Sequence, residues 1–187
     1  ALVKLFVEED RRPQQAVSAA ADALARAVDG IVERLHLGGR LFYLGAGTSG
    51  RLGVLDAAEC PPTFCSDPEL VQGVLAGGAP ALLRSSEGLE DLEEAGRSDL
   101  LSRGFGAADC LVGIAAGGTT PYVRGGLACA KELGALAIAM ACVPSDQALL
   151  PCDIDIRLLT GPELLTGSTR LKAGTATKMA LNILSTG

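Results

Sequence analysis

Apolar residues follow two different patterns along this chain. Between Pro13 and Leu37 they recur every three or four positions, which predicts an amphipathic helix that ends at Gly38 and Gly39. Short continuous apolar runs follow, and they predict five strands, at 40–44, 70–76, 110–115, 135–142 and 154–159. Helical patterns separate or follow these runs, through Leu52, Leu55 and Ala58 and over 88–101, 121–133 and 173–184.

The regular alternation of strands and helices predicts an α/β fold with a parallel sheet, because parallel strands need helical crossovers. We expect five parallel strands flanked by helices on both faces, a three-layer αβα sandwich of the flavodoxin-like Rossmann type. Residues 1–39 are expected to form an N-terminal helical arm that packs on the domain or on a partner. Residues 40–187 are expected to form the domain itself.

Three segments rich in Gly, Ser and Thr follow the first, third and fifth expected strands. They are Gly45–Gly50, Ala116–Thr120 and Thr166–Arg170. Sheets of this kind bind ligands beyond the carboxyl ends of their strands, so we expect these turns to meet at one crevice.

The first turn has the composition of an anion site. Gly47, Thr48, Ser49, Gly50 and Arg51 open a helix, and they offer backbone N–H groups, two hydroxyls and a cation to a phosphate. Two alternatives remain open: a dinucleotide site, although no acidic residue ends the second strand, and a plain turn with capping hydroxyls.

The other two turns repeat this chemistry. Gly117, Thr119 and Thr120 precede a helix that begins near Pro121, where either threonine could act only as an N-cap. The third turn adds hydroxyls and cations suited to a charged sugar derivative, with a solvated basic turn as the alternative. The candidate ligand-binding residues there are Ser168, Thr169 and Lys172.

Acidic residues supply candidates for proton transfer. Glu59 follows an apolar helix face, and Cys60-Pro61-Pro62 predicts that the helix ends at this point. Glu87 and Glu90 lie three residues apart at the start of the second crossover helix, close to the end of the second strand. Two carboxylates that reach one crevice can act as base and acid, whereas the alternative is an ordinary solvated helix face.

Composition excludes several classes of function. The net charge is −6 and only 3% of residues are aromatic, so a nucleic-acid partner is not expected. The six cysteines form no CxxC pair and there is one histidine, so we expect buried thiols in a reducing compartment and no metal site. No segment has the length and apolarity of a membrane span, and we expect a cytoplasmic protein. The chain lacks an initial Met and stops just after a helical pattern, so we expect a fragment.

Longer segments resemble the N-acetylmuramic acid 6-phosphate etherases, a family within the sugar isomerase (SIS) superfamily that also contains the glucokinase regulatory protein. The similar segments are 41–63 (LFYLGAGTSGRLGVLDAAECPPT), 87–91 (EGLED) and 161–175 (GPELLTGSTRLKAGT). The resemblance implies a phosphosugar-binding SIS domain over 40–187, usually a homodimer, without the family's further C-terminal helical region. It implies no cofactor.

The resemblance also implies an activity in amino-sugar metabolism and peptidoglycan recycling. This lyase removes D-lactate from N-acetylmuramic acid 6-phosphate and leaves N-acetylglucosamine 6-phosphate, by elimination followed by addition of water. The family's two catalytic carboxylates match Glu59, interpreted as the base at C2, and Glu90, interpreted as the acid and then the base.

One turn departs from the etherase pattern. Positions 117–119 usually read Ser-Gly-Arg, whereas this chain has Gly-Gly-Thr, so Thr119 is expected to replace the missing hydroxyl. The regulatory protein is similar to this chain at 117 and 119 but lacks a carboxylate at position 59. Two alternatives therefore remain open: a regulatory phosphosugar-binding module and an aldose-ketose phosphosugar isomerase.

Overall fold

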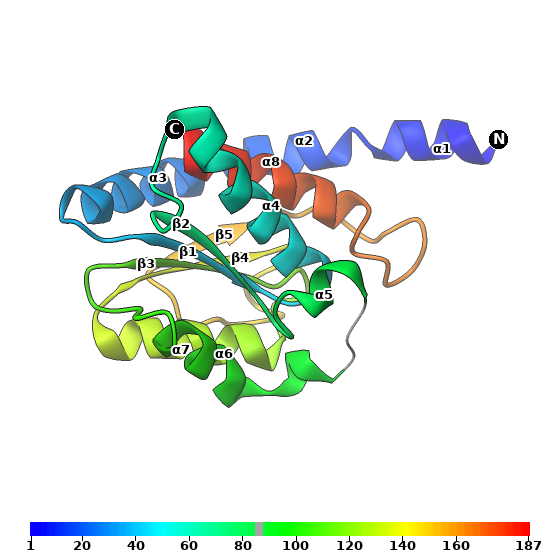
Figure 1. Ribbon diagram of the computed structural model, residues 1–187. Coiled ribbons are helices and arrows are strands. Elements are labelled where there is room, and N and C mark those ends of the chain that lie inside the picture. The colour runs from blue at the N-terminus through cyan, green and yellow to red at the C-terminus, as the bar shows by residue number, and fades with distance from the viewer. Residues whose placement is uncertain (85–87) are drawn as a thin grey trace.

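The protein, described by a computed structural model at residues 1–84 and 88–187, is built on one five-stranded parallel sheet. Its strands lie in the order β2-β1-β3-β4-β5, which is the flavodoxin-like order and confirms the expected fold class (Figure 1). Gly45 of β1 pairs with Leu75 of β2 and with Ile114 of β3, so these three strands end side by side. The strand bounds are β1 Leu41–Gly45, β2 Val71–Leu75, β3 Cys110–Ile114, β4 Leu136–Ala141 and β5 Ile154–Arg157.

Helices cover both faces of the sheet (Figure 1). One face carries α2 (Arg12–Ala19), α3 (Ala21–His36), α4 (Gly47–Phe64) and α8 (Lys172–Thr186). The opposite face carries α6 (Glu93–Leu101) and α7 (Pro121–Leu133). The shorter elements are α1 (Leu2–Glu9), α5 (Pro80–Leu83) and a 3-10 turn, η1 (Leu89–Asp91).

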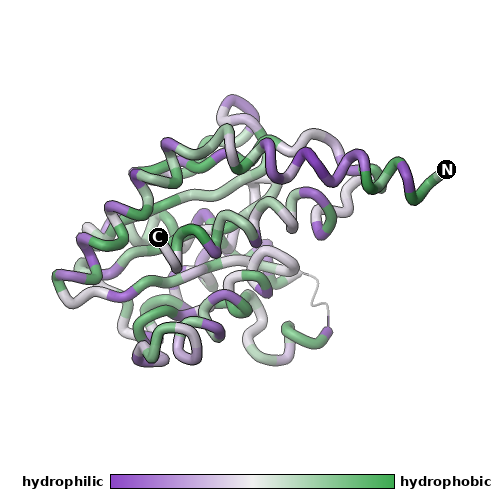
Figure 2. Tube along the Cα trace, turned by 90° about the horizontal axis from the view of Figure 1, so that it is seen from above, coloured by the Kyte–Doolittle hydropathy of each residue, from purple (hydrophilic) through white to green (hydrophobic). Residues whose placement is uncertain are grey.

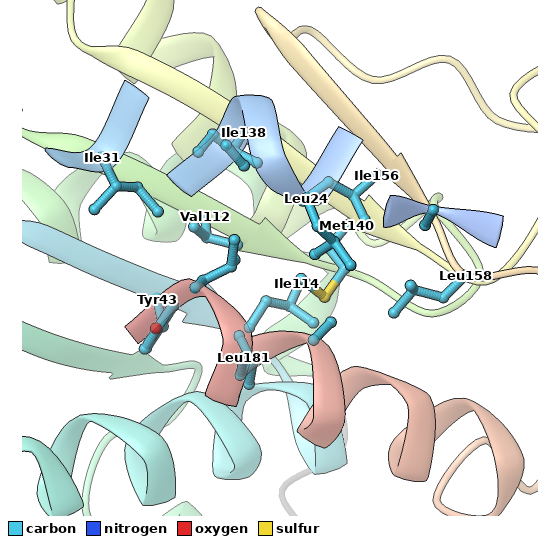
Figure 3. Packing of buried hydrophobic residues seen from close by; sticks show 14 of the residues in the cluster. Leu24, Ile31, Tyr43, Val112, Ile114, Ile138, Met140, Ile156, Leu158 and Leu181 are labelled. Carbon is cyan, nitrogen blue, oxygen red and sulfur yellow. The ribbon is translucent and has the colours of Figure 1, made fainter. Parts of the chain in front are cut away.

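Alternate residues of each strand build two separate cores. Tyr43, Val112 and Met140 point to the face that carries α3 and α8, where they meet Leu24 and Leu181 (Figure 3). Their chain neighbours, among them Phe42, Leu44 and Leu111, point to the face covered by α6 and α7. Because both faces are buried, the strands are apolar throughout, which explains why they stood out in the sequence. Seen from above, purple and green segments alternate along the helices, as expected for helices that bury only one side (Figure 2).

Three helix predictions were wrong in their bounds. The helix expected over 13–37 is α2 and α3, separated at Ala20, whose ψ of 7° lies outside the helical range. The helix expected over 88–101 is η1 and α6, separated by extended Leu92. The chain also forms α1, which lies within the expected N-terminal helical arm, and α5, which no pattern indicated.

The third wrong bound concerns the prolines. Helix α4 does not end at Glu59 but continues through Pro61 and Pro62 to Phe64. The prolines fall in its last turn, where few i→i−4 hydrogen bonds remain to be lost. The Cys65 N–H donates to the Pro61 carbonyl at 2.9 Å, so helical bonding resumes beyond them.

The cysteines are all free, and three of them, Cys60, Cys110 and Cys129, are buried. Cys65 is exposed at the end of α4, which corrects the expectation of uniformly buried thiols. Within residues 1–84 and 88–187, no helix combines the length and apolarity required to cross a membrane.

Candidate functional site

The turn between β1 and α4 brings strand and helix backbones into close contact. A Cβ on Gly50 would lie 2.3 Å from the Gly45 carbonyl oxygen, so the turn closes only with glycine at that position. Gly47 has a φ of +53° and begins the helix. The half-buried Thr48 and Ser49 lie in its first turn, and within residues 1–84 and 88–187 no side chain makes a capping hydrogen bond to this helix. The amides therefore remain available to an anion, contrary to the capping alternative.

The turn after β3 begins beside it, because β1 and β3 are neighbours. Thr120 occupies the N-cap position of α7 but makes no capping hydrogen bond. Gly118 has a φ of +71°, and a Cβ on it would lie 2.6 Å from Ala148 Cβ. Gly117 and Thr119 are exposed, and the nearest atom to a Cβ at 117 would be Thr119 Oγ1, at 3.8 Å. The Thr119 hydroxyl thus lies where a side chain at 117 would extend.

The third turn approaches the first through the start of α8. A Cβ on Gly174 would lie 3.4 Å from the Thr169 carbonyl oxygen and 3.6 Å from Thr48 Cγ2. The amides at this helix start are already occupied, because the Glu163 carboxylate accepts hydrogen bonds from Lys172 N and Ala173 N at 3.1 and 2.9 Å. An internal anion therefore fills the third expected anion site.

Lys172 is directed inward and away from solvent. Its side chain is 2% exposed, and Nζ donates to Glu9 Oε2 at 2.5 Å. This hydrogen bond lowers the pKa of Glu9 below its usual value, and the nearby Arg12 charge acts in the same direction. The predicted contact of Lys172 with a ligand would require displacement of Glu9. Ser168 is half-buried and Thr169 is exposed in the turn before it.

Two further predicted residues have other surroundings. Arg51 donates from Nε to the Ala81 carbonyl at 2.9 Å and from Nη2 to the Arg84 carbonyl at 3.4 Å, so it connects α4 to the segment around α5. Glu87 lies outside the described residues.

A groove between α4 and α8 holds the predicted base. It contains two neighbouring cavities, of about 240 and 290 Å³, which share Leu52 and Lys178. Glu59 lines the first cavity with Asp56 and Asn182. Thr48, Arg170 and Thr175 line the second. The groove therefore extends from the first glycine turn to Glu59.

A buried polar cluster, which no sequence pattern indicated, supports this groove. Asp56 is 7% exposed, and its Oδ1 accepts a hydrogen bond from Asn182 Nδ2 at 2.8 Å, which connects α4 to α8. Burial, together with the charge of Asp56, raises the pKa of Tyr43 and of the Cys60 thiol. The available signal was an aspartate on the buried face of an apolar helix, which requires a partner.

The two predicted catalytic acids lie on different sides of the sheet. Glu59 is exposed on α4, which packs on the same face as α8. Glu90 is exposed on η1, which contacts α7 on the opposite face. Glu59 is also twelve residues beyond Gly47, a distance of about 18 Å along the helix. A single chain therefore does not bring the two carboxylates to one crevice, contrary to our expectation.

Comparison with known proteins agrees with this fold. A family model described as the glucokinase regulatory protein N-terminal SIS domain matches residues 23–131. The chain belongs to this SIS-domain family. The structure of the phosphoheptose isomerase GmhA from Neisseria gonorrhoeae superimposes with a TM-score of 0.68 at 19% identity, covering 98% of this chain and 94% of its own. That likeness shows the SIS fold.

Curated relatives of this SIS domain carry an enzyme name. An N-acetylmuramic acid 6-phosphate etherase of Parasynechococcus marenigrum (strain WH8102) is 85% identical over 99% of this chain and 58% of its own length. One from Nostoc punctiforme (strain ATCC 29133 / PCC 73102) is 63% identical over 100% of this chain and 60% of its own. The chain thus spans about three fifths of the length of these relatives.

Proposed function

We propose that this SIS domain belongs to a carbon-oxygen lyase that converts N-acetylmuramic acid 6-phosphate and water into N-acetylglucosamine 6-phosphate and D-lactate. The observation that carries the proposal is the uncapped glycine turn at the start of α4. Because Glu59 lies about 18 Å along the helix from this turn, farther than a sugar phosphate spans, the turn and the Glu59 that serve one substrate are proposed to belong to different protomers. The turn suits a phosphate and the carboxylate suits proton abstraction. The relatives named as etherases support the same substrate.

The reaction requires two proton-transfer groups. A base, proposed as Glu59, takes the proton from C2 of the open-chain sugar, and the C3–O bond to lactate breaks as a C2–C3 double bond forms. An acid, proposed as Glu90, protonates the departing lactate oxygen. The same carboxylate then takes a proton from water as its oxygen adds at C3, and C2 is reprotonated. No oxidant or reductant is consumed.

The separation of the acids favours a site shared by two copies of the chain. A sheet with helices on both faces lies between Glu59 and Glu90, so the pair cannot reach one sugar ring within a single chain. In a homodimer, Glu59 of one protomer can face Glu90 of its partner, and symmetry then creates two equal sites. We place this dimer in the cytoplasm, because its free thiols suit a reducing compartment.

Lactate release by the full-length protein tests the activity. Glu59→Gln and Glu90→Gln should each abolish release from N-acetylmuramic acid 6-phosphate while sugar-phosphate binding persists. Unchanged turnover in both variants would refute the proposed roles.

Mixing the two inactive variants tests the shared site. After exchange of protomers, half of the dimers carry one intact site, so activity should return to about one quarter of the wild-type value. Mixing either variant with itself is the matched control. Inactive mixtures that demonstrably contain heterodimers would refute the shared site but leave the lyase activity standing.

A regulatory phosphosugar-binding module is the second candidate. It is favoured by Gly117, where the expected serine is missing, and by the match to the regulatory-protein family model. Calorimetry that detects sugar-phosphate binding, with no lactate formed by the full-length protein, would favour this candidate over the lyase.

A further inference from the structure

We propose that Lys178 recognises the lactyl carboxylate of the substrate and thereby distinguishes the muramic sugar from its glucosamine product. This inference rests on the proposed function and adds a specificity-determining residue to it. Lys178 did not stand out in the sequence, where it is one of several polar residues on the last helix.

The position of Lys178 is defined by the groove between α4 and α8. Lys178 is exposed on α8 and lines the same cavity as Glu59, which lies across the groove on α4. The other cation of the groove, Arg170, lines only the neighbouring cavity. Lys178 is therefore the cation that accompanies the proposed base among the residues lining this cavity.

The ammonium group of Lys178 has no internal partner in the described parts of the chain. Among residues 1–84 and 88–187, no carboxylate lies within ion-pair distance of its Nζ. The nearby Asp56 is buried, its Oδ1 accepts a hydrogen bond from Asn182, and its buried Oδ2 has no hydrogen-bond partner within the described residues, so Asp56 does not pair with Lys178. Lys172 provides the contrast, because its ammonium is buried and paired with Glu9.

The chemistry of the substrate connects the base to this cation. The base removes the proton at C2, and lactate is attached through oxygen to the adjacent carbon, C3. A group beside the base is therefore beside the lactyl substituent, which carries a carboxylate at neutral pH. An ammonium is the side-chain group that pairs with such an anion as a point charge. The product has a neutral hydroxyl at C3 and offers no such partner.

The test compares two ligands on one variant of the full-length protein. Lys178→Met removes the charge and keeps the length of the side chain. Calorimetry measures the affinity for N-acetylmuramic acid 6-phosphate and for N-acetylglucosamine 6-phosphate. We expect the first affinity to fall about 10- to 100-fold, as for loss of a hydrogen bond between charged groups, and the second to change less than about twofold. Lys178→Arg should retain most of the discrimination, and Lys4→Met, on exposed α1, is the matched control.

Each outcome decides the proposal. Equal weakening of both ligands would overturn it, because Lys178 would then act on a group that both sugars share. Unchanged affinities would overturn it as well, as would failure of the wild-type protein to bind either sugar. If Lys178→Met does not fold, loss of discrimination in Lys178→Gln with normal circular dichroism supports the proposal, and retained discrimination overturns it. Selective, Lys178-dependent binding without lactate release would support this inference while refuting the proposed lyase activity.

Discussion

Thr119 offers a direct test of the proposal that the altered second turn binds phosphate. Its hydroxyl lies 3.8 Å from the position that a Cβ on Gly117 would occupy, so the two positions can present a hydroxyl to the same region. Thr119→Val keeps the shape of the side chain and removes only the hydroxyl. Loss of one hydrogen bond to a charged group costs about 1.5–3 kcal/mol, which corresponds to a roughly 10- to 150-fold weaker affinity for the sugar phosphate.

Gly117→Ser in the Thr119→Val background should restore much of that affinity. Gly117 is exposed, its φ is outside the left-handed region, and 3.8 Å is an ordinary contact distance, so a serine fits without strain. Gly118→Ser is the matched control, because its φ of +71° and a Cβ only 2.6 Å from Ala148 Cβ do not accommodate a side chain. We expect that control to lose about 1–3 kcal/mol of stability and to restore nothing.

Calorimetric titration with N-acetylglucosamine 6-phosphate measures these affinities without dependence on turnover. Wild-type affinity in Thr119→Val would refute the role of the hydroxyl. A weakened Thr119→Val that Gly117→Ser fails to rescue, in a correctly folded double variant, would refute the equivalence of the two positions.

Three further predictions concern the arm, the core and the thiols. The hydrogen bond from Lys172 lowers the pKa of Glu9 below 4.5, so the stabilisation of α1 is present above that pH and is lost as the pH falls through the lowered value. Hydrogen exchange in α1 should therefore rise on acidification, and Glu9→Gln should remove this dependence. Gly126→Ala would place a Cβ 2.0 Å from Leu44 Cδ2 and should cost about 1–3 kcal/mol in chemical denaturation, whereas Gly106→Ala, with no atom within 4 Å, should cost little; equal costs would contradict the packing. An alkylating reagent should modify exposed Cys65 first, because burial raises the pKa of Cys142 to about 11; mass spectrometry that finds Cys142 modified first would disprove this order.

The sheet was predictable because its chemistry is local. Both faces are buried, so each strand is a short apolar run, and every strand lies within two residues of its predicted bounds. Helix ends were less predictable. A proline ends a helix when it removes backbone hydrogen bonds of the helix interior, whereas Pro61 and Pro62 lie in the last turn of α4 and the helix continues through them. The glycine turns were also found from sequence, because Gly50 approaches the Gly45 backbone closely and Gly118 has a φ of +71°, and both conditions require glycine.

The surroundings of the site residues depended on distant parts of the chain. Lys172 pairs with Glu9, 163 residues away, and Asp56 pairs with Asn182, 126 residues away. No local sequence pattern predicts partners so far away in the chain. The sequence therefore indicated that Lys172 was free to bind a ligand, whereas in the structure it pairs with Glu9. Similarly, Glu59 was expected to reach the crevice at the edge of the sheet. It lies instead twelve residues along α4, on the face of the sheet.

A site divided between two copies makes activity depend on protein concentration. If Glu59 and Glu90 act only across the dimer, an isolated protomer contains one Glu59 and one Glu90, but these two carboxylates do not reach the same sugar. Lactate release per milligram should then fall on dilution, with a midpoint equal to the dissociation constant of the dimer. Light scattering gives that constant independently. Constant specific activity at concentrations where scattering shows only monomer would mean that one chain brings both acids to the sugar, against the placement of α4 and η1 on opposite faces of the sheet.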